Sequence, residues 1–128
     1  FNIIPENFIT YRSRSDDGQF FFNINNMGFT GIISIYYPVF NVIDSSNIFV
    51  RDLLNFSWKK LYKYSVGTSQ KVLSIVDLKK LKFLIPTKPE QQKIADFLTS
   101  IDKVIQSKQL QISQAEKWKK GLMQGLFV

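Results

Sequence analysis

The sequence predicts an α+β protein in which a small mixed domain of strands and short helices is followed by one long helix. Residues 1–45 hold short runs of aromatic and β-branched residues separated by glycine and asparagine, which is typical of strands. From residue 48 to residue 64 the apolar residues recur at helical spacing. From Glu90 to about Gln124 a second, much longer helical pattern follows. The order of these patterns indicates a compact mixed part that leads into a single extended helix.

Two runs in the first part are predicted to be strands. They are "QFFFNI", residues 19–24, and "GIISIYYPVF", residues 31–40. Alternation along the second run would place Tyr36 and Tyr37 on opposite faces, with one of them in the core. Pro38 indicates that this run is an edge strand or ends there.

The middle of the chain reads as helix, loop, short helix and strand. Ser46 or Asn47 is expected to cap the helix over residues 48–64. A loop with small polar residues follows, and the spacing of Ser74 and Asp77 predicts a capping box for a helix over residues 75–80. The run "LKFLIP" is then expected to be a final strand that Pro86 closes.

The long helix has a clear start. Thr87 and Glu90 have the T-x-x-E spacing of a capping box, and Pro89 falls in the first turn, where its missing N–H costs nothing. A helix of roughly 37 residues would be about 55 Å long. We therefore expect much of it to extend beyond the mixed domain.

Apolar residues of the long helix fit heptads, which predicts pairing with another helix. Polar residues interrupt this seam at Lys108 and Gln111, where they would set register or partner choice. The alternative is that the apolar face packs only on the protein's own domain. The residues expected to pair are Ile94, Phe97, Ile101, Val104, Lys108, Gln111, Ala115, Trp118 and Leu122.

Composition excludes several classes of enzyme. Without cysteine or histidine the chain can form neither a disulfide, nor a zinc site that needs those ligands, nor a Ser-His-Asp triad. The carboxylates are scattered and no glycine-rich nucleotide motif occurs, so we expect no catalysis, no metal and no cofactor. The sequence shows no secretory signal and no apolar run long enough for a membrane span, and the absence of cysteine fits a reducing interior. These features favour a cytoplasmic protein.

Charge is distributed unevenly. Residues 1–58 carry three arginines and five acidic residues, a net charge of −2, whereas residues 59–128 carry fourteen lysines and five acidic residues, a net charge of +9. Such a basic half suggests a nucleic acid or an acidic protein as partner. A solvated, lysine-rich helix exterior is the alternative on charge alone.

Three segments resemble a known family when taken in order. "GIISIYYPVF", then "VGTSQKVLSIVDLKKLKFLIPTKPEQQKIADFLTSIDKVI", then "KWKKGLMQGLF" are similar to the C-terminal part of the specificity subunit of type I restriction–modification systems. The resemblance starts near Gly31 and covers most of the chain. Its most specific element is the order of a G-T-S-Q loop, a short helix, "IPTKPEQQKIADFL", a long helix and "KKGLMQGLF".

The resemblance implies a non-catalytic DNA-binding protein. Residues 1–86 would be a partial target recognition domain that reads one half of a bipartite double-stranded DNA sequence. Residues 87–128 would be a coiled-coil spacer helix, which pairs with a second spacer helix or forms a homodimer. Modification subunits would dock on this assembly and methylate DNA, and restriction subunits would join through the complex. Complete members have two such domains and two such helices, and this chain begins with Phe1, so we expect a half-subunit, a truncated product or a fragment.

Candidate DNA contacts lie in three places. In "YRSRSDDGQ", Arg12 and Arg14 would share one face of an extended segment, although they could instead form an ion cluster with Asp16 and Asp17. A loop that combines glycine, two hydroxyls, an amide and a cation suits a DNA contact, although it could also be an ordinary turn before a helix. The candidates are Arg12, Arg14, Ser15, Tyr36, Gly67, Thr68, Ser69, Gln70 and Lys71.

Two other functions compete with DNA recognition. One is a coiled-coil oligomerisation or adaptor module that does not itself bind DNA. The other is a nuclease or methyltransferase, which the missing metal ligands and cofactor loop disfavour. Salt-dependent DNA binding separates the first alternative from DNA recognition, because phosphate contacts release counterions.

Overall fold

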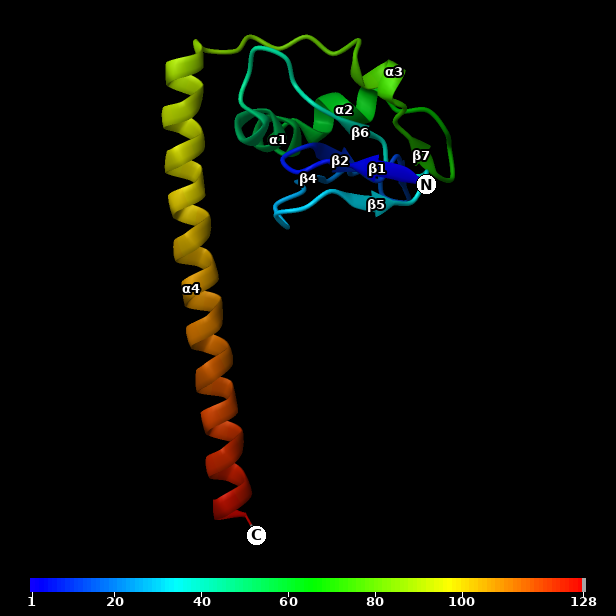
Figure 1. Ribbon diagram of the computed structural model, residues 1–128. Coiled ribbons are helices and arrows are strands. Elements are labelled where there is room, and N and C mark those ends of the chain that lie inside the picture. Colours follow the sequence, from blue (N-terminus) through cyan, green and yellow to red (C-terminus); the bar gives the residue numbers. More distant parts are fainter. Residues whose placement is uncertain (128) are drawn as a thin grey trace. The chain divides into compact units, whose positions relative to one another are not determined.

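The computed structural model describes residues 1–127 and has the predicted α+β class (Figure 1). It divides into two compact units, unit 1 from Phe1 to Gln92 and unit 2 from Lys93 onward. The strands are β1 Asn2–Ile4, β2 Ile9–Tyr11, β3 Arg14–Ser15, β4 Phe22–Ile24, β5 Gly31–Ile33, β6 Val39–Phe40 and β7 Lys71–Val72. The helices are α1 Asn47–Phe56, α2 Trp58–Tyr64, α3 Ile75–Leu78 and α4 Lys88–Leu126. No helix within residues 1–127 is both long enough and apolar enough to span a membrane.

Short antiparallel sheets make up the β part of unit 1. One has the order β4-β2-β6, one pairs β1 with β5, and one pairs β3 with β7. In the three-stranded sheet Ile9 lies opposite both Ile24 and Phe40. The strand predicted over residues 19–24 is confirmed for Phe22–Ile24, which form β4. Phe20 and Phe22 are buried while Phe21 is 65% exposed.

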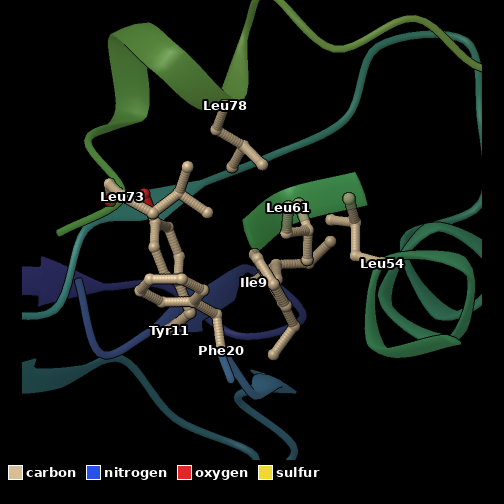
Figure 2. Packing of buried hydrophobic residues seen from close by; sticks show 8 residues of the cluster. Ile9, Tyr11, Phe20, Leu54, Leu61, Leu73 and Leu78 are labelled. Carbon is tan, nitrogen blue, oxygen red and sulfur yellow. Dashed lines mark hydrogen bonds between the residues drawn. The ribbon is translucent and has the colours of Figure 1, made fainter. Parts of the chain in front are cut away.

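The core of unit 1 lies between the three-stranded sheet and the three short helices. Each helix contributes one leucine, and Figure 2 shows these leucines and the β2 side chains directed toward one another. The ring centroids of Tyr11 and Phe22 are 4.7 Å apart in a stacked pair. Burial raises the pKa of the Tyr11 hydroxyl, which donates to the carbonyl oxygen of Leu73 at 2.7 Å. The buried cluster comprises Ile9, Tyr11, Phe20, Phe22, Leu54, Leu61, Leu73 and Leu78.

Residues 31–40 do not form one strand, so that prediction is wrong. The backbone N–H of Tyr37 donates to the carbonyl oxygen of Ser34 at 3.0 Å and closes a turn. This turn separates β5 from β6, and Pro38 immediately precedes β6 at the edge of its sheet. Tyr36 therefore lies in a turn and not on a strand face.

The helix predicted over residues 48–64 is two helices. Ser46 caps α1, as predicted, by accepting from the backbone N–H of Phe49 at 3.3 Å. Ser57 leaves the helical conformation with ψ 27°, and its own N–H still donates to the carbonyl oxygens of Leu53 and Leu54. Ser57 thus ends α1 and begins α2.

The helix after the loop is confirmed, and the strand after it is not. The hydroxyl of Ser74 accepts from the backbone N–H of Asp77 at 3.1 Å and caps α3, which ends at Leu78. Residues 81–86 are irregular, with Leu84 fully exposed. The ammonium of Lys60 donates to the carbonyl of Lys82, so a side chain supplies a partner that a neighbouring strand would otherwise provide.

The start of α4 depends on a residue that sequence reasoning missed. Gln91 is 2% exposed, and its side chain accepts from the N–H of Ser46 at 3.1 Å and donates to the carbonyl of Pro86 at 2.9 Å. The N–H of Gln91 also donates to the carbonyl oxygen of Thr87, which makes Thr87 the residue that precedes the first turn. The reciprocal capping box of Thr87 and Glu90 stays a prediction.

Candidate nucleic-acid interface

Two segments predicted from sequence to contact DNA are paired as neighbouring strands. β3 and β7 are antiparallel, with Arg14 opposite Val72 and Ser15 opposite Lys71. The backbone of Ser13 extends the link, because its carbonyl accepts from the N–H of Leu73 at 2.9 Å. The fold thereby brings the arginine segment beside the loop that begins at Gly67.

Tyr36 joins the same place from the turn between β5 and β6. Both the backbone N–H and the hydroxyl of Ser13 donate to the carbonyl oxygen of Tyr36 at 2.9 Å. The guanidinium carbon of Arg14 lies 4.7 Å from the centroid of the Tyr36 ring, within the range of a cation–π contact. The exposed ring of Tyr36 therefore holds Arg14 at the surface.

Arg12 and Arg14 are exposed and do not form the alternative ion cluster. Across the described part of the chain, no salt bridge joins either arginine to Asp16 or Asp17. Both arginines, both aspartates and Gln19 line a concave pocket with a volume of about 620 Å³. The guanidinium groups are thus available to an external anion.

Ser15 differs from the other candidates because it is buried. Its hydroxyl donates to Asp17 at 2.8 Å, and the backbone N–H of Gln19 donates to the same carboxylate oxygen at 2.9 Å. The Gln19 bond first, and the Ser15 bond second, lower the pKa of Asp17. The Ser15 hydroxyl therefore stabilises the turn that follows β3.

The loop from Gly67 to Lys71 is the tip of a closed hairpin. Val66 and Val72 exchange backbone hydrogen bonds of 2.9 and 2.8 Å at its base. Gly67 has φ +115°, and a Cβ there would overlap the carbonyl oxygen of Gln70. Only glycine fits this tight closure.

The side chains of the loop are held to different degrees. Thr68 and Ser69 are exposed. The amide of Gln70 donates to Asp16 at 3.0 Å, and the ammonium of Lys71 lies 4.8 Å from the centroid of the Tyr62 ring. The loop therefore presents two hydroxyls without a hydrogen-bond partner in unit 1, followed along the chain by a tethered amide and a tethered cation.

We use the name β3–β7 surface for the candidates other than Ser15 that the fold brings together, all of which are exposed except the half-buried Gln70 and Lys71. They are Arg12, Arg14, Tyr36, Gly67, Thr68, Ser69, Gln70 and Lys71. Sequence reasoning missed Tyr62, which packs against Gly18 and Lys71 and supports the loop from α2. The paired valines Val66 and Val72 around a glycine-containing tip were the available signal for the hairpin.

The predicted helix-pairing residues form a separate group on α4. In unit 2 the large apolar members of the seam are exposed, from 40% at Ile101 to 70% at Trp118. Lys108, Gln111 and Ala115 are exposed as well. An apolar row that is uncovered over this length is typical of a helix that pairs with another chain or segment.

Within residues 1–127 no group of acidic, cysteine or histidine side chains is arranged to hold a metal ion. A family model described as the type I restriction modification DNA specificity domain matches residues 1–117. No solved structure matches the chain significantly.

Proposed function

The chain belongs to the family of type I restriction modification DNA specificity domains, and from this premise we propose that the β3–β7 surface contacts one half of a bipartite DNA target. Its function is sequence recognition in a type I restriction–modification system, and its family is non-catalytic. DNA and the subunits of such a system are the partners that the family implies. The comparison offers no support for an adaptor without DNA binding.

One observation carries the proposal, namely the pairing of β3 with β7. This pairing places the exposed arginines next to a loop with exposed hydroxyls, an amide and a cation. Arginines and lysines neutralise phosphates, while hydroxyl, amide and guanidinium groups also reach base edges. Both kinds of contact are thus available on one surface.

Each residue has a role suited to its position. We assign Arg12 and Lys71 to phosphates, because a cation gives affinity without reading sequence. Arg14, fixed by the Tyr36 ring, has a bidentate fork that suits guanine or a phosphate. Gln70 is assigned to a base edge, and the hydroxyls of Thr68 and Ser69 to the backbone between these contacts.

Unit 2 is proposed to be the spacer. The exposed apolar seam of α4 would pair with a second spacer helix, either from another copy or from another segment. The functional boundary is proposed at Pro86, with residues 1–86 recognising DNA and residues 87–128 pairing. Modification subunits would dock on the paired assembly, and restriction subunits would join through them.

The chemistry is proposed to come from those other subunits. The purified chain, supplied with a methyl donor, ATP and magnesium, should neither methylate nor cut DNA. Without histidine or cysteine, proton transfer near neutral pH would require a strongly shifted carboxylate or lysine. Turnover by the purified chain that Asp16→Asn or Asp17→Asn abolishes would contradict this assignment.

The DNA-binding proposal is tested by replacing the two tethered loop side chains. Gln70→Ala with Lys71→Ala should weaken binding of the chain, assembled with its modification subunits, to a mixed-sequence duplex, and should also flatten the salt dependence. The free energy of unfolding should change by no more than about 1 kcal/mol, since the variant loses one cation–π contact of Lys71 and one surface hydrogen bond of Gln70.

A matched variant controls for residue type and charge. Lys103→Ala with Gln106→Ala removes the same two side-chain types from the exposed part of α4 and should leave the loop contacts intact. Equal DNA affinity of the loop variant and the parent would overturn the loop assignment. A large loss of thermal stability in the loop variant would show that these side chains are structural.

A further inference from the structure

Helix α2 carries two lysines that none of the roles above uses. Its sequence is WKKLYKY, and Leu61 at its centre is fully buried in the core. Lys59 and Lys63 each lie two positions from Leu61, about 200° around the helix, so both point away from the core. Both are exposed. We call this pair the lysine ridge.

The charges of the lysine ridge have no ionic partner in unit 1. The salt bridges of the described residues join Arg51 to Asp52, Lys80 to Asp77 and Lys88 to Asp44. The helix itself contains no acidic residue, and the two ridge lysines are spaced i,i+4, where like charges repel. The ammonium of Lys59 lies 5.6 Å from the centroid of the Trp58 ring, and Lys63 lies in the last turn of α2. Neither contact neutralises a charge, so both cations remain available to an external anion.

The ridge borders the β3–β7 surface through Tyr62. The Tyr62 ring packs against the backbone of Gly18, where any side chain would overlap it, and its other contact is the ammonium of Lys71. Gly18 belongs to the turn that follows β3, and the Val66–Val72 closure begins three residues after Lys63. Helix α2 is thus attached to both segments that form the β3–β7 surface.

We infer that the lysine ridge binds backbone phosphates of the DNA duplex that flank the bases contacted by the β3–β7 surface. The inference rests on the proposed function. In the proposed function Arg12, Arg14 and Lys71 bind DNA, and Lys71 contacts α2 through the Tyr62 ring. An ammonium binds phosphate as a point charge, which suits the two exposed lysines of the same helix. The ridge therefore adds affinity and orientation without sequence preference.

The test compares salt dependence in variants of the full chain assembled with its modification subunits. The probe is a labelled mixed-sequence duplex of about 30 base pairs, titrated between about 50 and 200 mM salt. Each phosphate contact contributes about −0.9 to the slope of log affinity against log salt, so Lys59→Gln with Lys63→Gln should reduce the slope by nearly two. The melting temperature should change little, because the loss of the Lys59 contact with the Trp58 ring is offset by the removal of repulsion between like charges.

A second pair of substitutions controls for net charge. Lys117→Gln with Lys120→Gln removes the same charge from exposed positions of α4 in unit 2. Its slope should differ from that of the parent by less than about 0.9, the value of one phosphate contact. Lys59→Arg with Lys63→Arg keeps the charge and should preserve the parental slope.

The outcomes separate this inference from the proposal on which it rests. A parental slope in the Gln ridge variant, together with a steep slope in the parent, overturns the ridge alone. If the Gln ridge variant no longer assembles with the modification subunits, the ridge is a protein-docking surface and the inference fails. If the parent assembly binds no DNA, both ideas fail.

Discussion

The side-chain amide of Gln70 donates a hydrogen bond of 3.0 Å to a carboxylate oxygen of Asp16, across 54 residues of sequence. The bond ties the loop tip to the turn that follows β3 and fixes which end of the amide faces Asp16. The other amide hydrogen and the amide oxygen remain, and together they match the acceptor and donor that adenine shows in the major groove. The same carboxylate places a negative charge beside a surface assigned to DNA.

We expect two substitutions at Asp16 to separate charge from tethering. Asp16→Asn keeps an acceptor for Gln70 and removes the charge, so it should raise affinity for duplex DNA by up to about fivefold, since unit charges about 4 Å apart in water interact by about 1 kcal/mol. Asp16→Ala removes both, so it should give a smaller gain because the Gln70 side chain is freed. Fluorescence anisotropy at a fixed salt concentration measures the DNA affinity of both variants.

Folding should be insensitive to either Asp16 variant, with changes within about ±0.5 kcal/mol, because the bond is at the surface. Identical gains in affinity from Asn and Ala would show that the tether has no role in binding. A loss of affinity in Asp16→Asn would show that the carboxylate itself contacts DNA.

Gly67→Ala should disrupt the loop. A side chain here meets both a left-handed backbone and the carbonyl oxygen of Gln70. The backbone term alone costs about 1–2 kcal/mol, so unfolding by denaturant should show at least that loss. DNA affinity should fall with it, because the tip can no longer close.

Two other glycines provide matched controls for Gly67→Ala. Gly28 has φ +78° with open space around it, so its change to Ala should cost only the backbone term. Gly121 lies inside α4, where Ala should stabilise the helix by about 0.5–1 kcal/mol. If Gly67→Ala cost no more than Gly28→Ala, the close approach at the loop would be unimportant.

Ile101→Asp with Val104→Asp should give a monomer if α4 pairs along its apolar seam. Charges on a seam cannot be desolvated without large cost, so the assembly should dissociate. Sedimentation velocity gives the oligomeric state directly. Gln106→Asp with Ser113→Asp adds two similar charges off the seam and should sediment like the parent. Unchanged sedimentation of the seam variant would mean that the seam does not hold copies together.

Acid should destabilise unit 1 through Asp77. The hydrogen bond from Lys80, followed by that from Ser74, lowers the pKa of this carboxyl from 3.8. A lowered pKa in the folded state contributes stability above pH 3.8, and that contribution is lost as pH falls through the folded-state pKa. Asp77→Asn should therefore melt below the parent near neutral pH and match it at an acid pH below the folded-state pKa of Asp77.

The pH experiment needs a control for simple loss of a carboxylate. Asp102→Asn, at an exposed position of α4, should leave the melting temperature of unit 1 unchanged at both pH values. If the melting temperature of Asp77→Asn stays below that of the parent at the lowest pH, the Asn side chain disturbs the α3 cap, and the loss of the Lys80–Asp77 ion pair is not the cause.

Local patterns predicted the helices better than the strands. The caps at Ser46 and Ser74 and the long helix were readable because capping residues and apolar period act within a few residues. The strands predicted over residues 31–40 and 81–86 were wrong, because a run of residues with high β propensity forms a strand only where a partner strand is available. In residues 81–86 the side chain of Lys60 provides a partner instead.

The candidate site was predictable in its residues but not in its assembly. Arg14 and Gln70 stood out by type, yet two-residue strands carry no periodicity, so nothing local indicates that β3 pairs with β7. The roles of Gln91 and Tyr62 were not predicted from the sequence for a related reason. Their roles depend on distant partners, a backbone amide at Ser46 and the open backbone at Gly18.

The separation of β3 from β7 along the chain sets when a nascent protein can complete the surface proposed to contact DNA. Arg12 and Arg14 are synthesised more than 50 residues before the strand that pairs with β3. Until Leu73 has left the ribosome, Ser13 lacks the amide that anchors it and the loop has not been made. Ribosome-bound chains that end before Leu73 should lack the contribution of this surface to DNA affinity, and that contribution should appear abruptly once the hairpin is complete.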